Sequence, residues 1–381
     1  QTTKIITTHF DYHSIDHNLL KLDILGHDDP TMIRMLEDIT GVDATKIRLD
    51  DPEVLSLFHG LEALHIKPED IGGTDLGSLG IPEFGTEFVM QMLRDTKPKA
   101  FSDLVRISGL SHGTDVWLGN AQTLIQEGKA QISTAICTRD DIMIYLIDKG
   151  VESEQSFKIM ESVRKGKGLE KADKTGNMSN NRAEIEAAHV PKWFIDSCLK
   201  ISYLFPRAHA VAYVMMAFRI AWFKVHRPLA FYSAYFSVRA KGFDASCMIK
   251  GDKVVQDKLR ELAVKEKEKT ITAAEKEMST TLEVCHEFYR RGFVFEPMDI
   301  YTSDATTFLV TENGLIPPFT SMPGIGEQAA QNIVEERKNG KFLSAEELIV
   351  RCPKASKAVV ELLEQIGALG SMPKTTQMTL F

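Results

Sequence analysis

The chain has 381 residues, of which 43% are hydrophobic and 26% are charged, and its formal net charge is −8. This length predicts two or three domains, and the composition is that of ordinary soluble proteins. The negative balance excludes a uniformly basic nucleic-acid binder, although local cationic patches can still bind phosphate.

Cysteines and apolar runs indicate the compartment. The five cysteines are far apart and form no Cys-x-x-Cys pair: Cys137, Cys198, Cys247, Cys285 and Cys352. This usage predicts reduced thiols and no zinc knuckle. The most apolar stretch, residues 208–223, contains His209 and Arg219 and falls short of the roughly 18 uninterrupted residues of a membrane span. We therefore expect a cytoplasmic protein with no membrane partner.

The start of the chain carries a carboxylate in an apolar run. Residues 4–10 and 19–25 alternate as two short strands, and Asp23 projects from one face of the second. An ionised carboxylate there must be paired, hydrogen-bonded or bound to a metal. Two interpretations stay open: an Asp that accepts hydrogen bonds from a loop, or a metal ligand on a sheet. Because the chain opens at Gln1 directly before the first strand, in a sequence that resembles the middle of a strand, we expect the C-terminal part of a longer protein.

Three histidines precede Asp23 at intervals of four residues, His9, His13 and His17. On a helix this spacing would align three imidazoles, which suits zinc or iron. A metal-dependent hydrolase built on these histidines and Asp23 is therefore one alternative. The segment has no helix-start signal, so the histidines can equally serve as hydrogen-bond partners.

Most of the remaining chain has helical periodicity. Asp28-Asp29-Pro30 introduces a helix over residues 31–40, and residues 84–238 read as a series of helices. The predicted fold class is α+β, mainly helical, with a small N-terminal sheet.

A cationic turn, Arg164-Lys165-Gly166-Lys167-Gly168, follows one of these helices. Side-chain charge and close backbone approach at glycine could wrap a phosphate, and a solvated loop is equally compatible with the pattern.

Residues 205–213 then open a long helix that runs through residue 225. His209 and Tyr213 lie one turn apart on it, with Arg207 just before them. Small residues between them leave room for a flat ligand. A core tyrosine and a capping histidine explain the same pattern.

A hairpin with two glycines lies near the C-terminal end. Gly324, Ile325 and Gly326 open a helix, and a second helix begins at Ser344. This turn resembles the hairpin of a helix-hairpin-helix module, in which backbone N–H groups meet a DNA phosphate. Lys338 and Lys341 supply nearby cations. The alternative is a plain turn between two helices.

The last residues form a polar tail with exposed apolar side chains. They are Gln377, Met378, Leu380 and Phe381. An extended peptide of this kind suits docking into a pocket of a partner protein.

Several segments together resemble the replicative C-family DNA polymerases, specifically the PolC-type polymerase III alpha subunit. The resemblance covers essentially the whole chain, and its motifs occur in the order of the family. The segments are Leu20-Lys21-Leu22-Asp23-Ile24-Leu25-Gly26, Gly109-Leu110-Ser111-His112-Gly113-Thr114-Asp115-Val116-Trp117, Arg139-Asp140-Asp141-Ile142-Met143 and Phe205-Pro206-Arg207-Ala208-His209-Ala210.

The resemblance implies four parts. A palm remnant occupies residues 1–45, helical fingers 46–250, a duplex-binding domain with a helix-hairpin-helix near 322–350 occupies 251–370, and a tail that binds the sliding clamp covers 371–381. Asp23 would be the third palm carboxylate, which helps two Mg²⁺ ions act on the primer 3′-hydroxyl. The other two carboxylates lie upstream in this family. Asp28-Asp29 and Asp140-Asp141 are adjacent pairs that point apart or cap helices and do not replace them.

The resemblance also implies a nucleotide site in the fingers. Candidates for the triphosphate and the nascent base pair are Arg139, Arg164, Lys165, Lys167, Arg207, His209, Tyr213 and His112. The implied function is transfer of dNTPs to a primer 3′ end, with primer-template DNA, dNTP, the sliding clamp and the upstream part of the same polymerase as partners. A 3′–5′ exonuclease is implied for the full-length protein. The alternative is a non-catalytic DNA- and clamp-binding module, and we expect the isolated chain to be inactive.

Overall fold

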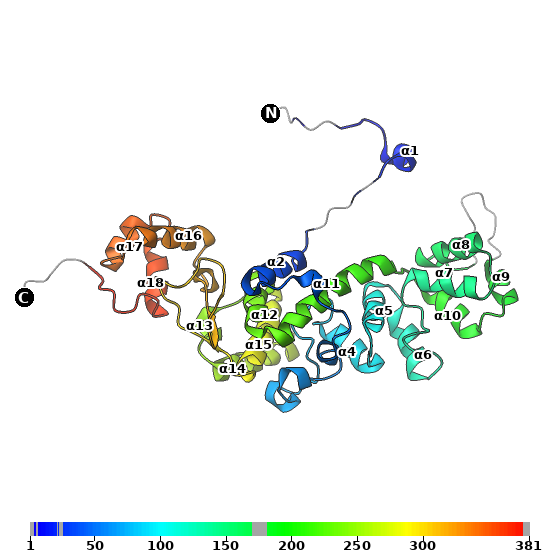
Figure 1. Ribbon diagram of the computed structural model, residues 1–381, viewed down its shortest axis with the longest axis horizontal. Helices are drawn as coiled ribbons and strands as arrows, with labels where there is room; N and C mark the ends of the chain where they lie inside the picture. The colour runs from blue at the N-terminus through cyan, green and yellow to red at the C-terminus, as the bar shows by residue number, and fades with distance from the viewer. Residues whose placement is uncertain (1–3, 5–6, 21, 23–25, 170–180, 376–381) are drawn as a thin grey trace, which may run out of the picture.

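The computed structural model describes residues 4, 7–20, 22, 26–169 and 181–375. The described part is mainly helical with one small three-stranded sheet, which confirms the predicted α+β class. Figure 1 shows an elongated body in which α7–α10 lie at one end and α16–α18 at the other. The long helix α11 (Arg207–His226) crosses between the centre and the first of these ends.

The N-terminal segment differs from the prediction. Its described residues contain no strand, and the segment between the two predicted strands forms the short helices α1 (Tyr12–Ile15) and η1 (Asp16–Asn18). Leu20 and Leu22 are 85% and 73% exposed. A strand needs hydrogen-bonded neighbours, and the described residues offer none here. The predicted N-terminal sheet is therefore wrong for the described residues, and Asp23 lies outside them.

Helix α2 (Asp29–Thr40) starts where the Asp-Pro signal places it. Pro30 occupies its first turn, and Gly41 ends it in a left-handed conformation. Asp29 is buried and pairs with Arg239 at 2.6 Å, so this carboxylate joins α2 to η6 (Tyr235–Arg239).

The helices of the first hydrophobic core surround the N-terminal half of α11. They pack Phe84, Leu104, Ile142 and Phe194 against Val214 and Phe218. The elements are α3 (Pro52–Ser56), η3 (Glu62–Leu64), η4 (Pro68–Ile71), α4 (Glu87–Thr96), α5 (Phe101–His112), η5 (Trp117–Ala121), α6 (Gln122–Gln126), α7 (Arg139–Asp148), α8 (Ser153–Arg164), α9 (Asn181–Ala187) and α10 (Lys192–Lys200). The short helix η2 (Ala44–Lys46) packs instead with α2 in a second core.

Helix α11 belongs to two cores. Ala217 and Phe218 pack in the first core, and Ile220 and Phe223 pack in the second. Among the described helices, it alone is long and apolar enough to cross a membrane. Its buried side chains and the buried ammonium of Lys224 identify it as a core helix.

The second core lies at the centre of the body. Met32 and Leu36 of α2 pack there with Phe223, Tyr232 and the helices that follow, so residues 29–47 share a core with residues 220–315. The further elements are α12 (Pro228–Ala234), α13 (Ala245–Met248), α14 (Asp252–Lys267) and α15 (Ala273–Arg290).

The sheet covers this second core. Strand β3 (Gly314–Ile316) lies between β1 (Val294–Phe295), which it pairs in parallel, and β2 (Leu309–Val310), which it pairs antiparallel. Phe295 and Leu315 lie opposite each other and point into the core.

The C-terminal helices form a third, separate core around Phe319, Ile333 and Leu363. They are η7 (Phe319–Ser321), α16 (Glu327–Glu336), η8 (Arg337–Asn339), α17 (Ala345–Arg351) and α18 (Lys357–Gln365). The Ser344 hydroxyl accepts a hydrogen bond from the Glu347 N–H, so the second helix of the predicted module begins where the sequence places it.

Candidate functional site

The segment of residues 202–206 joins four helix ends at the start of α11. Tyr203 and Thr114, just past α5, exchange backbone hydrogen bonds of 3.0 and 3.2 Å. The Phe205 carbonyl accepts from the Arg139 N–H at 3.2 Å, at the start of α7. The Leu204 N–H donates to the Arg164 carbonyl at 3.4 Å, at the end of α8. Residues from four distant parts of the sequence therefore meet here.

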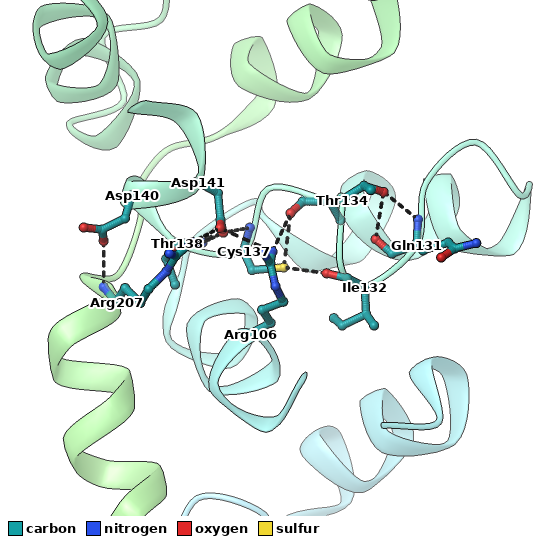
Figure 2. A network of polar contacts seen from close by, with 10 residues as sticks. Arg106, Gln131, Ile132, Thr134, Cys137, Thr138, Asp140, Asp141 and Arg207 are labelled. Atoms are coloured by element: carbon teal, nitrogen blue, oxygen red, sulfur yellow. Dashed lines mark hydrogen bonds and ion pairs between the residues drawn. The ribbon is translucent and has the colours of Figure 1, made fainter. Parts of the chain in front are cut away.

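Two carboxylates lock α7 onto α11, as Figure 2 shows. The Asp141 carboxylate accepts from the N–H groups of Cys137 and Thr138 at 3.0 and 2.8 Å and caps α7. The Asp140 carboxylate accepts from the Arg207 N–H at 2.8 Å and so caps α11. Both acids are therefore structural, as the interpretation of this adjacent pair predicts.

The predicted cation Arg207 has a partner within this network. Its guanidinium pairs with Asp141, and Arg106 of α5 lies 3.3 Å from the same carboxylate. One carboxylate thus serves two guanidinium groups, and the second carboxylate at this helix start, Asp140, balances the remaining positive charge.

Three of the predicted cations gather around Glu161 of α8. Arg164 binds its carboxylate through two hydrogen bonds of 2.7 and 2.9 Å, Lys165 lies 2.8 Å away, and Arg139 lies 3.8 Å away. The Arg164 hydrogen bonds, with Lys165 beside them, lower the pKa of Glu161 to about 2. The cluster therefore keeps a fixed arrangement at neutral pH and carries more positive than negative charge.

The glycine turn behind this cluster packs closely on the 202–206 segment. Gly166 has a φ of +65°, and a Cβ atom there would lie 2.6 Å from the Ser202 carbonyl oxygen. Only glycine fits this approach. Lys167 follows it and is exposed. The turn is therefore an ordered part of the site.

Aromatic rings lie beside the cations. Phe205 stacks on His112, with centroids 4.8 Å apart, and its ring centroid lies 6.0 Å from that of His209 and 6.5 Å from that of Tyr213. Tyr213 stacks in turn on His27 at 5.0 Å. The structure thus brings three predicted residues, His112, His209 and Tyr213, around one phenylalanine.

The Glu83 carboxylate holds His112 in place through its Nε2 atom. Glu83 lies 2.6 Å from the His112 Nε2 atom, and this contact raises the pKa of His112. The imidazole is therefore more easily protonated than a free histidine.

The glycine hairpin opens the third core and precedes α16. Gly324 has a φ of +97°, and a Cβ atom there would lie 2.8 Å from the Leu362 side chain. Ile325 is buried, and no side chain caps the start of α16. The amide groups at this start are thus free of a capping side chain.

The predicted lysines of this module are partly paired. Lys338 lies 2.9 Å from Glu335, and Lys341 lies over the ring of Tyr301 at 5.8 Å. From residue 322 to residue 374, seven Lys and Arg residues are balanced by seven Glu residues. Any phosphate contact here must depend on the hairpin amides more than on net charge.

The remaining predicted residues form no site in the described part. Asp23, Gln377, Met378, Leu380 and Phe381 lie outside it. Its His, Cys, Asp and Glu residues contain no group of three or more that could hold a metal ion, so His9, His13 and His17 do not converge there. The described residues therefore supply no Mg²⁺ site and give no support to the hydrolase alternative.

Sequence reasoning missed three residues that organise the site. Glu161 could have been found from its spacing, because it precedes Arg164 and Lys165 by three and four residues on a helix. Phe205 belongs to the segment of residues 205–210 that carries the resemblance, but no role was predicted for it. Glu83 gave no sequence signal, since its contact to His112 spans 29 residues.

Two regions of the chain match known protein families. Residues 29–186 match the family described as the bacterial DNA polymerase III alpha subunit finger domain, and residues 292–378 match the helix-hairpin-helix motif. The chain is thus part of a bacterial DNA polymerase III.

The most similar relatives narrow this class. Proteins named DNA polymerase III PolC-type are 54% identical over 381 residues in Caldanaerobacter subterraneus subsp. tengcongensis, 54% over 375 residues in Bacillus subtilis and 52% over 379 residues in Clostridium perfringens. These alignments cover 98–100% of this chain and 25–26% of the relatives, so the chain spans about a quarter of their length. The chain is a part of a PolC-type DNA polymerase III.

Proposed function

We propose that this chain supplies the nucleotide-binding fingers, the duplex grip and the sliding-clamp tail of a cytoplasmic replicative DNA polymerase that adds dNTPs to a primer 3′ end. One observation carries the proposal. The Phe205 carbonyl accepts a hydrogen bond from the first residue of the cation cluster, Arg139, while the Phe205 ring stacks on His112. A cationic surface and an aromatic surface therefore adjoin at one residue.

The cation cluster suits a triphosphate. Arg139, Arg164 and Lys165 share a single carboxylate, so an incoming polyanion can compete for their remaining donors. The start of α11 adds the positive end of a helix dipole, with Ala208 and His209 exposed there. Such an arrangement stabilises the charge of a phosphoryl group without further rearrangement of the protein.

The aromatic cluster suits the base. The rings of Phe205, Tyr213 and His209 lie beside the cations, and stacking on aromatic faces is how proteins hold a base without reading its edge. A polymerase needs this tolerance, because the template selects which of the four bases is correct.

The C-terminal module suits duplex DNA. The uncapped start of α16 follows Gly324, Ile325 and Gly326, and amide groups of this kind bind phosphate oxygens without sequence preference. We propose that primer-template DNA contacts this hairpin. We also propose that Gln377, Met378, Leu380 and Phe381 bind the sliding clamp.

Asp23 is proposed as one ligand of the two Mg²⁺ ions, and the upstream part of the polymerase would supply the other carboxylates. When bound, the metal would supply charge for the developing phosphoryl transition state. The chain's own contribution is to place the triphosphate and the base beside that centre. By this proposal the isolated chain binds DNA without extending a primer.

Tyr213→Ala in the full-length polymerase is expected to raise the KM for dNTP by about tenfold, because loss of a stacking ring costs roughly 1–3 kcal/mol per base. Single-nucleotide primer extension over a range of dNTP concentrations measures this value. The free energy of unfolding should fall as for any half-buried tyrosine.

Tyr145→Ala is the matched control. Tyr145 is also a half-buried tyrosine that stacks on a ring, Phe194, at 4.3 Å, but it lies away from Phe205 on α7. Tyr145→Ala should lower the free energy of unfolding by a similar amount and should keep the KM of the parent for dNTP. Equal KM values in the two variants would refute the aromatic surface as a base-binding site.

Deletion of residues 377–381 is expected to lower affinity for the sliding clamp at least tenfold and to leave duplex affinity within about twofold, because the hairpin and the tail are separate sites. Surface plasmon resonance with immobilised clamp, and fluorescence anisotropy with labelled duplex, measure the two affinities. Clamp binding that survives the deletion would contradict the role proposed for the tail.

A further inference from the structure

Glu83 occupies an unusual backbone conformation beside the aromatic cluster. Its φ is +69°, a left-handed value that costs a residue with a Cβ atom backbone energy. Its side chain is only 15% exposed, and the carboxylate contacts the His112 Nε2 atom at 2.6 Å and the Ser108 hydroxyl at 3.3 Å. Backbone strain of this kind persists where surrounding contacts require it and is concentrated at functional sites.

The contact with Glu83 determines which atoms of the His112 imidazole remain available for a ligand. The Nε2 atom is occupied by Glu83, the ring plane stacks on Phe205, and the Nδ1 atom has no hydrogen-bond partner among the described residues. A protonated imidazole over a phenyl ring is favourable as a cation–π contact. Nδ1–H is then the one donor that His112 has left to offer.

Other charged groups surround this pair. A cavity of about 460 Å³ is lined by Glu83, His112, Tyr235 and Arg239 together with Thr86 and Ser111. Arg239 is held by Asp29, so its charge is largely matched. The rings of His209 and Tyr213 lie 6.0 and 6.5 Å from the Phe205 ring on which His112 stacks. The carboxylate nearest to His112 is therefore Glu83.

We propose that Glu83 is a positioning residue of the nucleotide site, which holds His112 as an oriented cation whose free Nδ1–H donates to a phosphate or sugar oxygen of the incoming nucleotide. This inference rests on the nucleotide site proposed above. Glu83 itself does not touch the nucleotide, and it acts through the charge and the orientation of His112.

The proposal predicts a pH dependence with a definite sign. The Glu83 hydrogen bond raises the pKa of His112, so the cation is present below this raised pKa and is lost above it. Without the carboxylate, burial and the lost hydrogen bond lower that pKa, and the cation disappears at a lower pH. The effect of removing Glu83 should therefore be largest between the lowered pKa of the variant and the raised pKa of the parent, and it should vanish below both.

The first experiment tests the pair without activity. The 381-residue chain is labelled with ¹³C-histidine, and the His112 resonance is identified by its disappearance in His112→Gln. In Glu83→Gln the pKa of His112 is expected to fall, since a neutral amide replaces a charged partner. An unchanged pKa would overturn the proposal at its first step.

The second experiment measures the KM for dNTP in the full-length polymerase between pH 6 and pH 8. Glu83→Gln is expected to raise it about tenfold between the two His112 pKa values that the first experiment measures and less than about twofold below both, and His112→Gln should raise it in both ranges. Glu83→Gly relieves the positive φ and should reproduce the pH profile of Glu83→Gln without loss of thermal stability. Glu87→Gln, which alters an exposed carboxylate paired with Arg94, is the control with no expected change.

The outcomes distinguish the contact between Glu83 and His112 from the role of His112 in nucleotide binding. If Glu83→Gln moves the pKa of His112 but His112→Gln leaves the dNTP KM unchanged at every pH, the pair exists and His112 has no part in nucleotide binding. If Glu83→Gly has the parent's pH profile, Glu83 is structural only. Either result overturns the proposal.

Discussion

Lys224→Met is expected to lower the free energy of unfolding by about 3–5 kcal/mol, because it leaves a buried carboxylate without its cation. Lys224 and Glu287 are both fully buried and lie 2.8 Å apart. The ammonium also donates to the carbonyls of Gly77 and Leu79 at 2.8 and 2.6 Å. Tyr232 donates to the same carboxylate at 2.6 Å. These contacts tie α11, α12, α15 and the segment before α4 together.

The charge of Lys224 near neutral pH follows from its surroundings. Burial lowers the pKa of Lys224 to about 8, and the adjacent Glu287 limits the fall, so the lysine remains charged near pH 7. Urea denaturation of the chain followed by circular dichroism measures the predicted loss. Lys258→Met is the control, because Lys258 pairs with Glu261 in a partly exposed contact of 2.9 Å and should cost less than about 1 kcal/mol. Equal losses in both variants would contradict a central role for the buried pair.

Asp23→Asn in the full-length polymerase is expected to lower kcat by roughly 10³-fold, because an amide cannot supply the charge that a metal-bound carboxylate supplies in phosphoryl transfer. Primer extension at saturating dNTP measures kcat, and anisotropy with labelled duplex should show unchanged DNA affinity. The same assay on the 381-residue chain alone should show no extension.

Asp28→Asn is the matched control for this prediction. Asp28 is an exposed carboxylate five residues away and makes no side-chain cap on α2. Its replacement should leave kcat within about twofold. Full activity of Asp23→Asn would show that Asp23 is not a ligand of the catalytic metal. Primer extension by the isolated chain would contradict the proposal that the upstream part supplies the other carboxylates.

Part of the candidate site was predictable because its signals are local. The cationic turn after α8, and His209 and Tyr213 one turn apart on α11, are patterns within a few residues of each other. The capping role of Asp141 follows from Thr138 three residues earlier. The N-terminal strands were predicted from alternation alone, and the described residues of that segment contain none. Alternation is not sufficient, because a strand exists only with a neighbour that supplies its hydrogen bonds.

The sequence alone determined the helical character, the long helix α11, the glycine hairpin before α16 and the relationship to PolC-type polymerases. Tertiary structure decided that Glu161 gathers cations from α7 and α8, that Glu83 fixes His112, and that Lys224 meets Glu287 across 63 residues. The physical reason is the distance along the sequence over which each interaction acts. Helix periods, caps and glycine turns follow from interactions within one or two turns, whereas buried charge pairs depend on which distant segments the cores bring together.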